Sequence, residues 1–234
     1  MYCSYLCEVM HVVSSLQKQN VPRTSIRLFI SFVCICTDLC RRWPPAQDFF
    51  PFKVYLLVVM AGGYPYDDIP KCNMNGGCSN LHNSQVSSEA SYHVSENWPP
   101  ESKILWSGFE VGIKVLTGGP DFQQCAVATL ENPVVVAMIE YMGGPNIGRC
   151  SWDPLTTLIA VRGVAAGGCA ECLDCDGRNS VDPKDGSNHW IFGEQSNQTY
   201  LVLKDIQAAE DAINTLLCQV PLFGTTSAPP CKGK

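Results

Sequence analysis

Continuous apolar runs alternate with helix-like segments along the chain from residue 53 onward. Residues 53–60 (KVYLLVVM) and 102–108 (SKILWSG) are apolar runs that end at or just before glycine, which is typical of strands buried on both faces of a parallel sheet. Residues 132–144 (NPVVVAMIEYMGG) begin with Asn-Pro and end with Gly-Gly, the start and stop signals of a helix. Strands and helices that alternate in this way favour an α/β domain.

Two more helices and a hairpin are predicted in the C-terminal half. Residues 152–163 (WDPLTTLIAVRG) have Asp153 as a candidate N-cap, a proline in the first turn and apolar residues at helical spacing. Residues 205–217 (DIQAAEDAINTLL) predict a helix capped by Asp205, with one apolar stripe. The stripe consists of Ile206, Ala209, Ile213 and Leu216. Residues 189–193 (HWIFG) and 199–203 (TYLVL) predict the two strands of a hairpin.

The first 52 residues differ from the rest of the chain. Their apolar run at 28–36 (LFISFVCIC) is too short to span a bilayer and is interpreted as a buried strand, or as a run with no structural role. Residues 41–52 (RRWPPAQDFFPF) contain three prolines, which break any regular element. We therefore expect three parts: an unrelated or poorly folded leader at 1–52, a domain at 53–221, and a disordered tail at 222–234.

The net charge argues against one class of function, and the cysteine content bears on the cellular compartment of the protein. The net charge is −6, which argues against nucleic-acid binding because phosphate neutralisation needs clustered Lys and Arg. Fourteen cysteines favour an oxidising compartment, whereas the chain opens without a clean signal peptide. Secreted and cytoplasmic locations therefore both stay open.

Four groups of residues could carry chemistry. Glycines follow the strand at 53–60, where they could let the backbone approach a ligand closely or form a plain surface loop. Further along lies Glu89 with amide and hydroxyl neighbours, which could bind sugar hydroxyls or form a solvated loop surface. These neighbours are Asn80, Asn83 and Ser91. Trp152 and Asp153 either fill the core and cap a helix, or place a flat stacking surface beside a carboxylate. Finally, Cys169, Cys172 and Cys175 have the C-x2-C-x2-C spacing of a zinc half-site, with disulfide-bonded or free cysteines as the alternative.

Four segments in this order resemble the inosine/uridine-preferring nucleoside hydrolase family over residues 53–221. They are LLVVMAGG (56–63), SSEASYHVSENWP (87–99), KILWSGFEVG (103–112) and SWDPLTTLIAVRG (151–163). The family hydrolyses the N-glycosidic bond of ribonucleosides within a Rossmann-like α/β fold and uses bound calcium. The resemblance thus implies a small-molecule nucleoside as partner, neither nucleic acid nor membrane, and allows a homo-oligomer.

The resemblance also implies roles for single residues. Asp153 would be a calcium ligand, and Trp152 would stack on the base, as in the purine-specific branch of the family. Met60 and Glu89 would line the ribose site. The family's Gly-Asn position would fall on Asn83, with Asn80 as the rival, and a serine at position 91 stands where the family has Asn.

The resemblance is incomplete at the N-terminal side. The family begins with a strand that ends in an Asp-x-Asp-x-x-x-Asp-Asp loop, which supplies the general base and most metal ligands. Residues 1–53 do not match this loop. We therefore expect a partial Rossmann-like nucleoside hydrolase fold that lacks the N-terminal strands, with unknown catalytic residues. A catalytically inactive remnant and a cysteine-based zinc-binding module are the alternatives.

Overall fold

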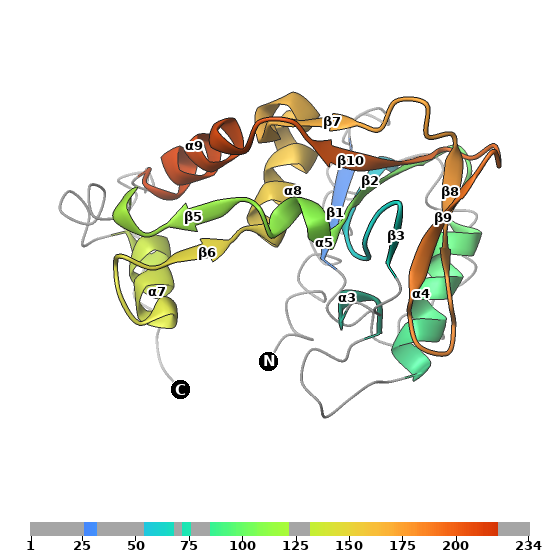
Figure 1. Cartoon of the computed structure of the whole chain (residues 1–234), viewed down its shortest axis with the longest axis horizontal. Helices are drawn as coiled ribbons and strands as arrows, with labels where there is room; N and C mark the ends of the chain where they lie inside the picture. The colour runs from blue at the N-terminus through green and yellow to red at the C-terminus, as the bar shows by residue number, and fades with distance from the viewer. Residues whose placement is uncertain (1–25, 32–53, 68–71, 76–84, 122–131, 220–234) are drawn as a thin grey trace, which may run out of the picture.

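The structure, a computed structural model of the chain, describes residues 26–31, 54–67, 72–75, 85–121 and 132–219. Its centre is a five-stranded sheet with the order β1-β2-β4-β10-β7 (Figure 1). The strands are β1 (Ile26–Ser31), β2 (Val54–Met60), β4 (Lys103–Ser107), β10 (Gln198–Leu203) and β7 (Cys169–Glu171). Neighbouring strands are parallel, except that β7 runs antiparallel to β10 at one edge. The predicted α/β class and the two predicted parallel strands are confirmed.

Strand β2 is buried on both faces, as its unbroken apolar run predicts. Leu57, Val58 and Val59 are each 0% exposed. Leu57 and Val59 belong to one core cluster together with Trp106 of β4. Val58 belongs to a second cluster on the opposite face, together with Leu155. Burial of both faces is the physical reason why this strand lacks the alternation of polar and apolar residues seen in half-exposed strands.

Helices cover both faces of the sheet. On one face, Val94 of α4 (Gln85–Asn97) packs against the cluster that contains Leu57. On the other face, α8 (Trp152–Arg162) and α9 (Ile206–Leu217) contribute to the cluster that contains Val58. The helices α4 and α8 therefore lie on opposite sides of the sheet, an arrangement that decides below which predicted site residues can meet.

Strand β1 comes from the segment that sequence analysis set apart from the domain. Residues 26–31 pair in parallel with β2, with Ser31 opposite Met60. The strand overlaps the apolar run at 28–36, for which one interpretation was a buried strand. The division of the chain at residue 52 stays a prediction, because residues 32–53 lie outside the described residues.

The predicted hairpin is wrong in its pairing. Residues of the first predicted strand lie in β9 (Asn188–Phe192), but β9 pairs antiparallel with β8 (Gly177–Val181) and with β3 (Tyr66–Asp67). The second predicted strand lies in β10, which instead runs parallel to β4 in the main sheet. The apolar residues of β10 are needed in the core between the two helix layers, whereas β8 alternates buried and half-buried positions over a three-stranded sheet of its own.

Helix ends follow the expected capping chemistry at two of three sites. Asn132 caps α7 (Pro133–Met142) by accepting from Val134 N–H and Val135 N–H, and Asp205 caps α9 by accepting from Ala208 N–H. The predicted cap Asp153 is wrong, because α8 begins at Trp152 and its N-cap is Ser151. Asp153 therefore lies inside the first turn, where a negative charge still suits the helix dipole.

Smaller elements complete the described part of the chain. A ribbon of β5 (Leu116–Gly118) and β6 (Gly148–Cys150) lies with α7 at one end of the molecule, on the left of Figure 1. The short helices are α3 (Cys72–Asn75), α5 (Phe109–Gly112) and the 3-10 helix η2 (Val164–Gly167). Within the described residues, none of the helices has both the length and the apolar character needed to cross a bilayer.

Candidate functional site

Three parallel strands of the main sheet end side by side. Ser31 of β1 is paired with Met60 of β2, and Met60 is paired with Ser107 of β4. In open α/β sheets, ligands bind in the crevice outside the carboxyl ends of the strands. This edge, and the segments that follow Met60 and Ser107, therefore form the candidate site.

At the end of β2, Asn73 of α3 contacts Met60. Its Nδ2 lies 3.0 Å from Met60 O and 2.7 Å from Met60 Sδ, and its Oδ1 accepts from Gly62 N–H at 3.4 Å. Asn73 is half-buried and Met60 is buried. An amide side chain thus lies beside the predicted ribose-site residue Met60. Asn73 was not predicted as a site residue, although it lies in the glycine-rich stretch that follows a buried strand.

Glu89 is not among the residues that line the cavity beside Trp152. Glu89 is exposed on α4, where Gln85 Nε2 donates to its Oε1 at 3.0 Å, and α4 and α8 cover opposite faces of the sheet. The neighbouring Ser91 is buried and its hydroxyl donates to Met74 O at 2.7 Å, so it joins α4 to α3. The other two predicted sugar-binding residues, Asn80 and Asn83, lie outside the described residues.

Trp152 is joined to the end of β2 through Phe109. Phe109 N–H donates to Gly62 O at 2.8 Å, which ties the start of α5 to the turn after β2. The Phe109 and Trp152 rings stack with centroids 5.4 Å apart and an interplanar angle of 29°, and Trp152 Nε1–H donates to Phe109 O at 3.0 Å. The indole therefore has a satisfied donor and a fixed orientation at the same sheet edge as Met60.

A cavity of about 570 Å³ opens between α7 and the start of α8. This size falls within the usual range of small-molecule sites, which is roughly 300–1,000 Å³. Trp152 and Asp153 form one wall, and Tyr141 and Arg149 form another, with the guanidinium of Arg149 lying 4.5 Å from the centroid of the Tyr141 ring. Two methionines, Met138 and Met142, supply adaptable apolar surface. The cavity thus combines aromatic, apolar and charged side chains.

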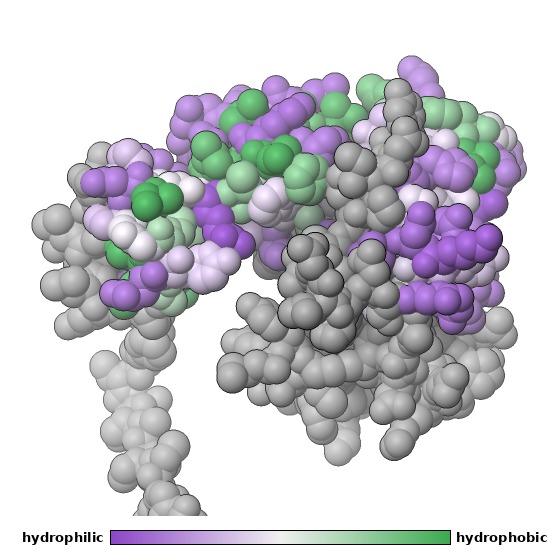
Figure 2. Space-filling view, turned by 60° about the horizontal axis from the view of Figure 1, so that its bottom comes forward, coloured by the Kyte–Doolittle hydropathy of each residue, from purple (hydrophilic) through white to green (hydrophobic). Residues whose placement is uncertain are grey.

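The surface around this cavity differs from that at the other end of the molecule. In Figure 2, hydrophilic residues gather on the right, where α4 and the β8–β9 hairpin lie. The left part, which carries α7, β5 and β6, is mixed, and several large apolar side chains there are exposed. They include Leu116, Val134, Tyr141 and Ile147.

Calcium does not fit the donor set that the described residues offer. Calcium takes six to eight oxygen ligands, mostly carboxylates and carbonyls. Asp153 is the carboxylate at the cavity wall, and the described ranges contain no group of three or more His, Cys, Asp or Glu side chains that could hold a metal ion. The fit of the family's metal to this chain therefore depends on residues outside those ranges.

The cysteine cluster is divided between two environments. Cys172 and Cys175 form a disulfide, with their Cα atoms 5.6 Å apart. Cys169 is a free, buried cysteine in the opposite core cluster, and burial raises its pKa to about 11. A zinc site needs thiolates, and the disulfide removes two of the three candidate ligands. The described residues thus favour the disulfide alternative for this cluster.

One buried titratable group lies beside the site. Burial, together with the negative charge of Glu110, raises the pKa of Tyr64 well above its usual value. Tyr64 N–H donates to Glu110 Oε2 at 3.1 Å, and its ring stacks on Tyr200. Tyr64 is therefore a neutral, packed aromatic residue of the core cluster that contains Leu57.

Comparisons with known proteins identify the class of fold. Neither a family model nor a curated protein matches the chain. Among solved structures, it is similar to an inosine-uridine preferring nucleoside hydrolase from Bacillus anthracis, with 17% identity, a TM-score of 0.55, and coverage of 91% of this chain and 65% of that chain. It is also similar to a purine-preferring ribonucleoside hydrolase from Gardnerella vaginalis, with 14% identity, a TM-score of 0.50, and coverage of 74% and 55% respectively. The plant nucleoside hydrolase PpNRh1 matches with 12% identity, a TM-score of 0.47, and coverage of 74% and 56%.

The described part of the chain therefore has a nucleoside hydrolase-like α/β fold. The chain spans between 55% and 65% of the length of these three solved structures. At identities below 20%, these matches establish the fold and leave the activity to be argued from the site.

Proposed function

We propose that the chain binds a ribonucleoside, with a purine as the preferred base, and that it hydrolyses the N-glycosidic bond to ribose and free base. The observation that carries this proposal is the placement of Trp152. Trp152 is one of the residues that line the cavity, its ring stacks on Phe109, and Phe109 N–H donates to Gly62 O in the turn that follows Met60. A flat aromatic surface thus lies next to the strand edge where an α/β fold binds its ligand.

In this proposal, the base stacks against Trp152 and the ribose lies toward Met60. Cleavage of an N-glycosidic bond builds positive charge on the ribose and negative charge on the departing base. The electron-rich face of an indole favours a protonated, electron-poor base, which is the better leaving group. Asn73 lies at the ribose end, where its amide bonds to Met60 and to Gly62 N–H and so holds the end of β2.

Calcium, which the family resemblance implies, finds one carboxylate, Asp153, among the described residues that line the cavity, and this donor set does not fit the ion. Because the described residues do not complete such a site, our proposal assigns only binding and orientation to this chain's residues. The proposed catalytic residues remain unassigned.

An assay of inosine cleavage tests the proposed activity. Released hypoxanthine should be detectable with the wild-type chain in the presence of calcium, and should fall below a tenth of that rate in Trp152→Ala. Tyr92→Ala, which removes an exposed aromatic side chain from α4, serves as the control and should retain the wild-type rate. Equal rates for Trp152→Ala and the control would contradict the assignment of Trp152.

A nucleoside-binding protein without turnover is the second candidate. It is favoured by the single carboxylate that the described residues place at the cavity. In that case inosine would bind to the wild-type chain and less tightly to Trp152→Ala, but hypoxanthine would not be released with or without calcium. The same two measurements, binding and release, thus separate the two candidates.

A further inference from the structure

One side chain of the β8–β9 hairpin reaches the glycine turn that follows β2. Gly63 N–H donates to Asn188 Oδ1 at 2.9 Å, and Asn188 Nδ2 donates to Gly63 O at 3.0 Å. Both bonds are buried, and Asn188 is 3% exposed. Since buried backbone groups need partners, the amide of Asn188 serves Gly63 in the way that a neighbouring strand would.

The approach is so close that position 62 must be glycine. Gly62 has a φ of +70°, a conformation that other residues rarely adopt. A Cβ atom at this position would also lie 2.5 Å from Asn188 Oδ1. Asn188 is therefore packed directly against the turn, although Gly63 and Asn188 are 125 residues apart in the chain.

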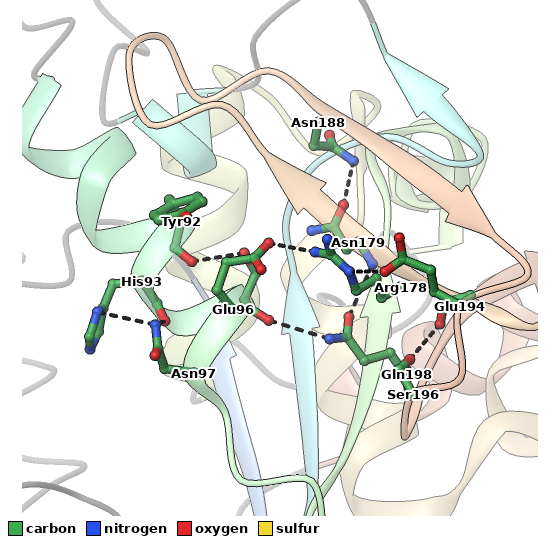
Figure 3. A network of polar contacts seen from close by, with 12 residues as sticks. Tyr92, His93, Glu96, Asn97, Arg178, Asn179, Asn188, Glu194, Ser196 and Gln198 are labelled. Atoms are coloured by element: carbon green, nitrogen blue, oxygen red, sulfur yellow. Dashed lines mark hydrogen bonds and ion pairs between the residues drawn. The ribbon is translucent and has the colours of Figure 1, made fainter.

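Asn188 is held in turn by a polar network that extends to α4 (Figure 3). Its Nδ2 also donates to Asn179 Oδ1 at 3.0 Å, and Asn179 N–H donates to Gln198 Oε1 at 3.2 Å. Gln198 Nε2 donates to Ser95 O of α4 at 3.3 Å. These bonds hold the Asn188 side chain in the orientation that its two bonds to Gly63 require. We call this pair of bonds to Gly63 the clamp on the turn, and the network preorganises it.

The same hairpin strand that carries Asn179 is fastened to α4 by charge. Arg178 Nη1 donates to Glu96 of α4 at 2.6 Å, and its Nε donates to Glu194 at 2.5 Å. These contacts are partly exposed, so each contributes little by itself. Their effect is geometric, because they hold the hairpin at one position relative to the helix and thereby support the network that ends on Asn188.

The clamped turn lies between the two halves of the candidate site. On one side, Gly62 N–H is directed at Asn73 Oδ1, and Asn73 contacts Met60. On the other side, Gly62 O accepts from Phe109 N–H, and Phe109 carries the indole of Trp152. A shift of this turn would move Asn73 and Phe109, and would thereby change the distance between the proposed ribose end and the proposed base end of the site.

We propose that Asn188 is a positioning residue of the nucleoside site. It acts through the peptide of Gly63, and its network keeps the Gly62–Gly63 turn fixed so that the two halves of the site match one ligand. The part of the inference that concerns nucleoside affinity rests on the proposed function, whereas the clamp on Gly63 does not.

Two measurements on the full chain test this inference. Hydrogen exchange at the Gly63 amide reports whether the turn is clamped, and titration calorimetry with inosine reports whether the clamp matters for binding.

The variants are Asn188→Ala, which removes both bonds to Gly63, and Asn188→Asp, which keeps the acceptor for Gly63 N–H and loses the donor. Asn197→Ala removes an exposed Asn side chain that donates to Pro100 O, and it is the matched control. Ile213→Val, in the opposite core cluster, controls for a general loss of stability.

We expect Gly63 exchange to be at least tenfold faster in Asn188→Ala, with a smaller increase in Asn188→Asp, and an inosine Kd at least fivefold weaker in both. Exchange in β4 and the inosine Kd of both controls should stay within twofold of wild type. Unchanged Gly63 exchange in Asn188→Ala would overturn the clamp. Faster exchange with an unchanged Kd would overturn the positioning role. If wild type does not bind inosine at all, the proposed function fails, and Gly63 exchange still decides whether Asn188 clamps the turn.

Discussion

At the scale of single residues, the candidate site depends on a glycine with a positive φ, Gly62, and on Trp152, whose indole N–H group has a hydrogen-bond partner. Trp152 was predicted to offer a flat stacking surface, and its ring stacks on Phe109 while its Nε1–H donates to Phe109 O. Glu89 was predicted to bind sugar hydroxyls, and it lies on the exposed surface of α4 with its Oε1 accepting from Gln85 Nε2. Asn73 was not singled out because the glycine-rich stretch pointed to a site without showing which of its residues contacts Met60.

Substitution of Gly62 tests the turn directly. Gly62→Ala should lower the free energy of unfolding by about 1–3 kcal/mol, because an alanine at positive φ is strained and its Cβ would lie too close to Asn188 Oδ1. Gly143→Ala has a positive φ but open space around the Cβ position, so it should cost less, and Gly144→Ala should cost least. Urea unfolding of the three variants measures the order, and a Gly62→Ala variant as stable as Gly144→Ala would contradict the packing of Asn188 against the turn.

The thiol of Cys169 should be inert up to high pH. Burial raises its pKa to about 11, so the folded state keeps the neutral thiol where an unfolded chain would already ionise. The stability that this buried thiol contributes is therefore fully present below about pH 9, the pKa of a cysteine in the unfolded chain, and is lost as the pH rises toward 11. Alkylation of native protein at pH 8, followed by peptide mass mapping, should modify the half-buried Cys150 well before Cys169. Equal rates of modification would show that Cys169 is accessible.

At the scale of elements, sequence signals that act over a few residues predicted individual strands and helices. The run at 53–60 and the Asn-Pro start of α7 each act within a few residues, and both elements formed as expected. The pairing of β9 with β8 and of β10 with β4 depends on which apolar residues the core needs, which is a property of the whole sheet. The strand β8 was overlooked because its sequence, GRNSV, is mostly polar and contains no apolar run.

The caps of two helices give a prediction at this scale. Asn132 is 1% exposed and, besides capping α7, donates through Nδ2 to Leu217 O and Gln219 O at the end of α9. Asn132→Ala should therefore cost about 2–3 kcal/mol, since it removes the cap of α7 and also two part-buried hydrogen bonds to the end of α9. Asp205→Ala removes an exposed cap from α9 and should cost about 1 kcal/mol. Chemical denaturation measures both, and equal losses would contradict the role of Asn132 in joining α7 to α9.

At the scale of the whole molecule, the fold brings together residues that are far apart in the chain. The carboxyl ends of β2 and β4, the start of α8 and the hairpin side chain Asn188 converge on one turn, although they span residues 60 to 188. The fold class was predictable because alternating strands and helices limit the architecture. The identity of the residues at the site was only partly predictable, because it depends on which face of the sheet each helix covers.

Equilibrium binding of inosine tests the central claim most directly. Calorimetric titration of the wild-type chain should give a saturable one-to-one isotherm, and Trp152→Ala should weaken the Kd at least tenfold, since stacking of a base on an aromatic ring contributes about 1–3 kcal/mol. Tyr92→Ala should bind as wild type does. An isotherm that is absent in the wild-type chain, or that is the same in Trp152→Ala as in wild type, would contradict a nucleoside site at Trp152.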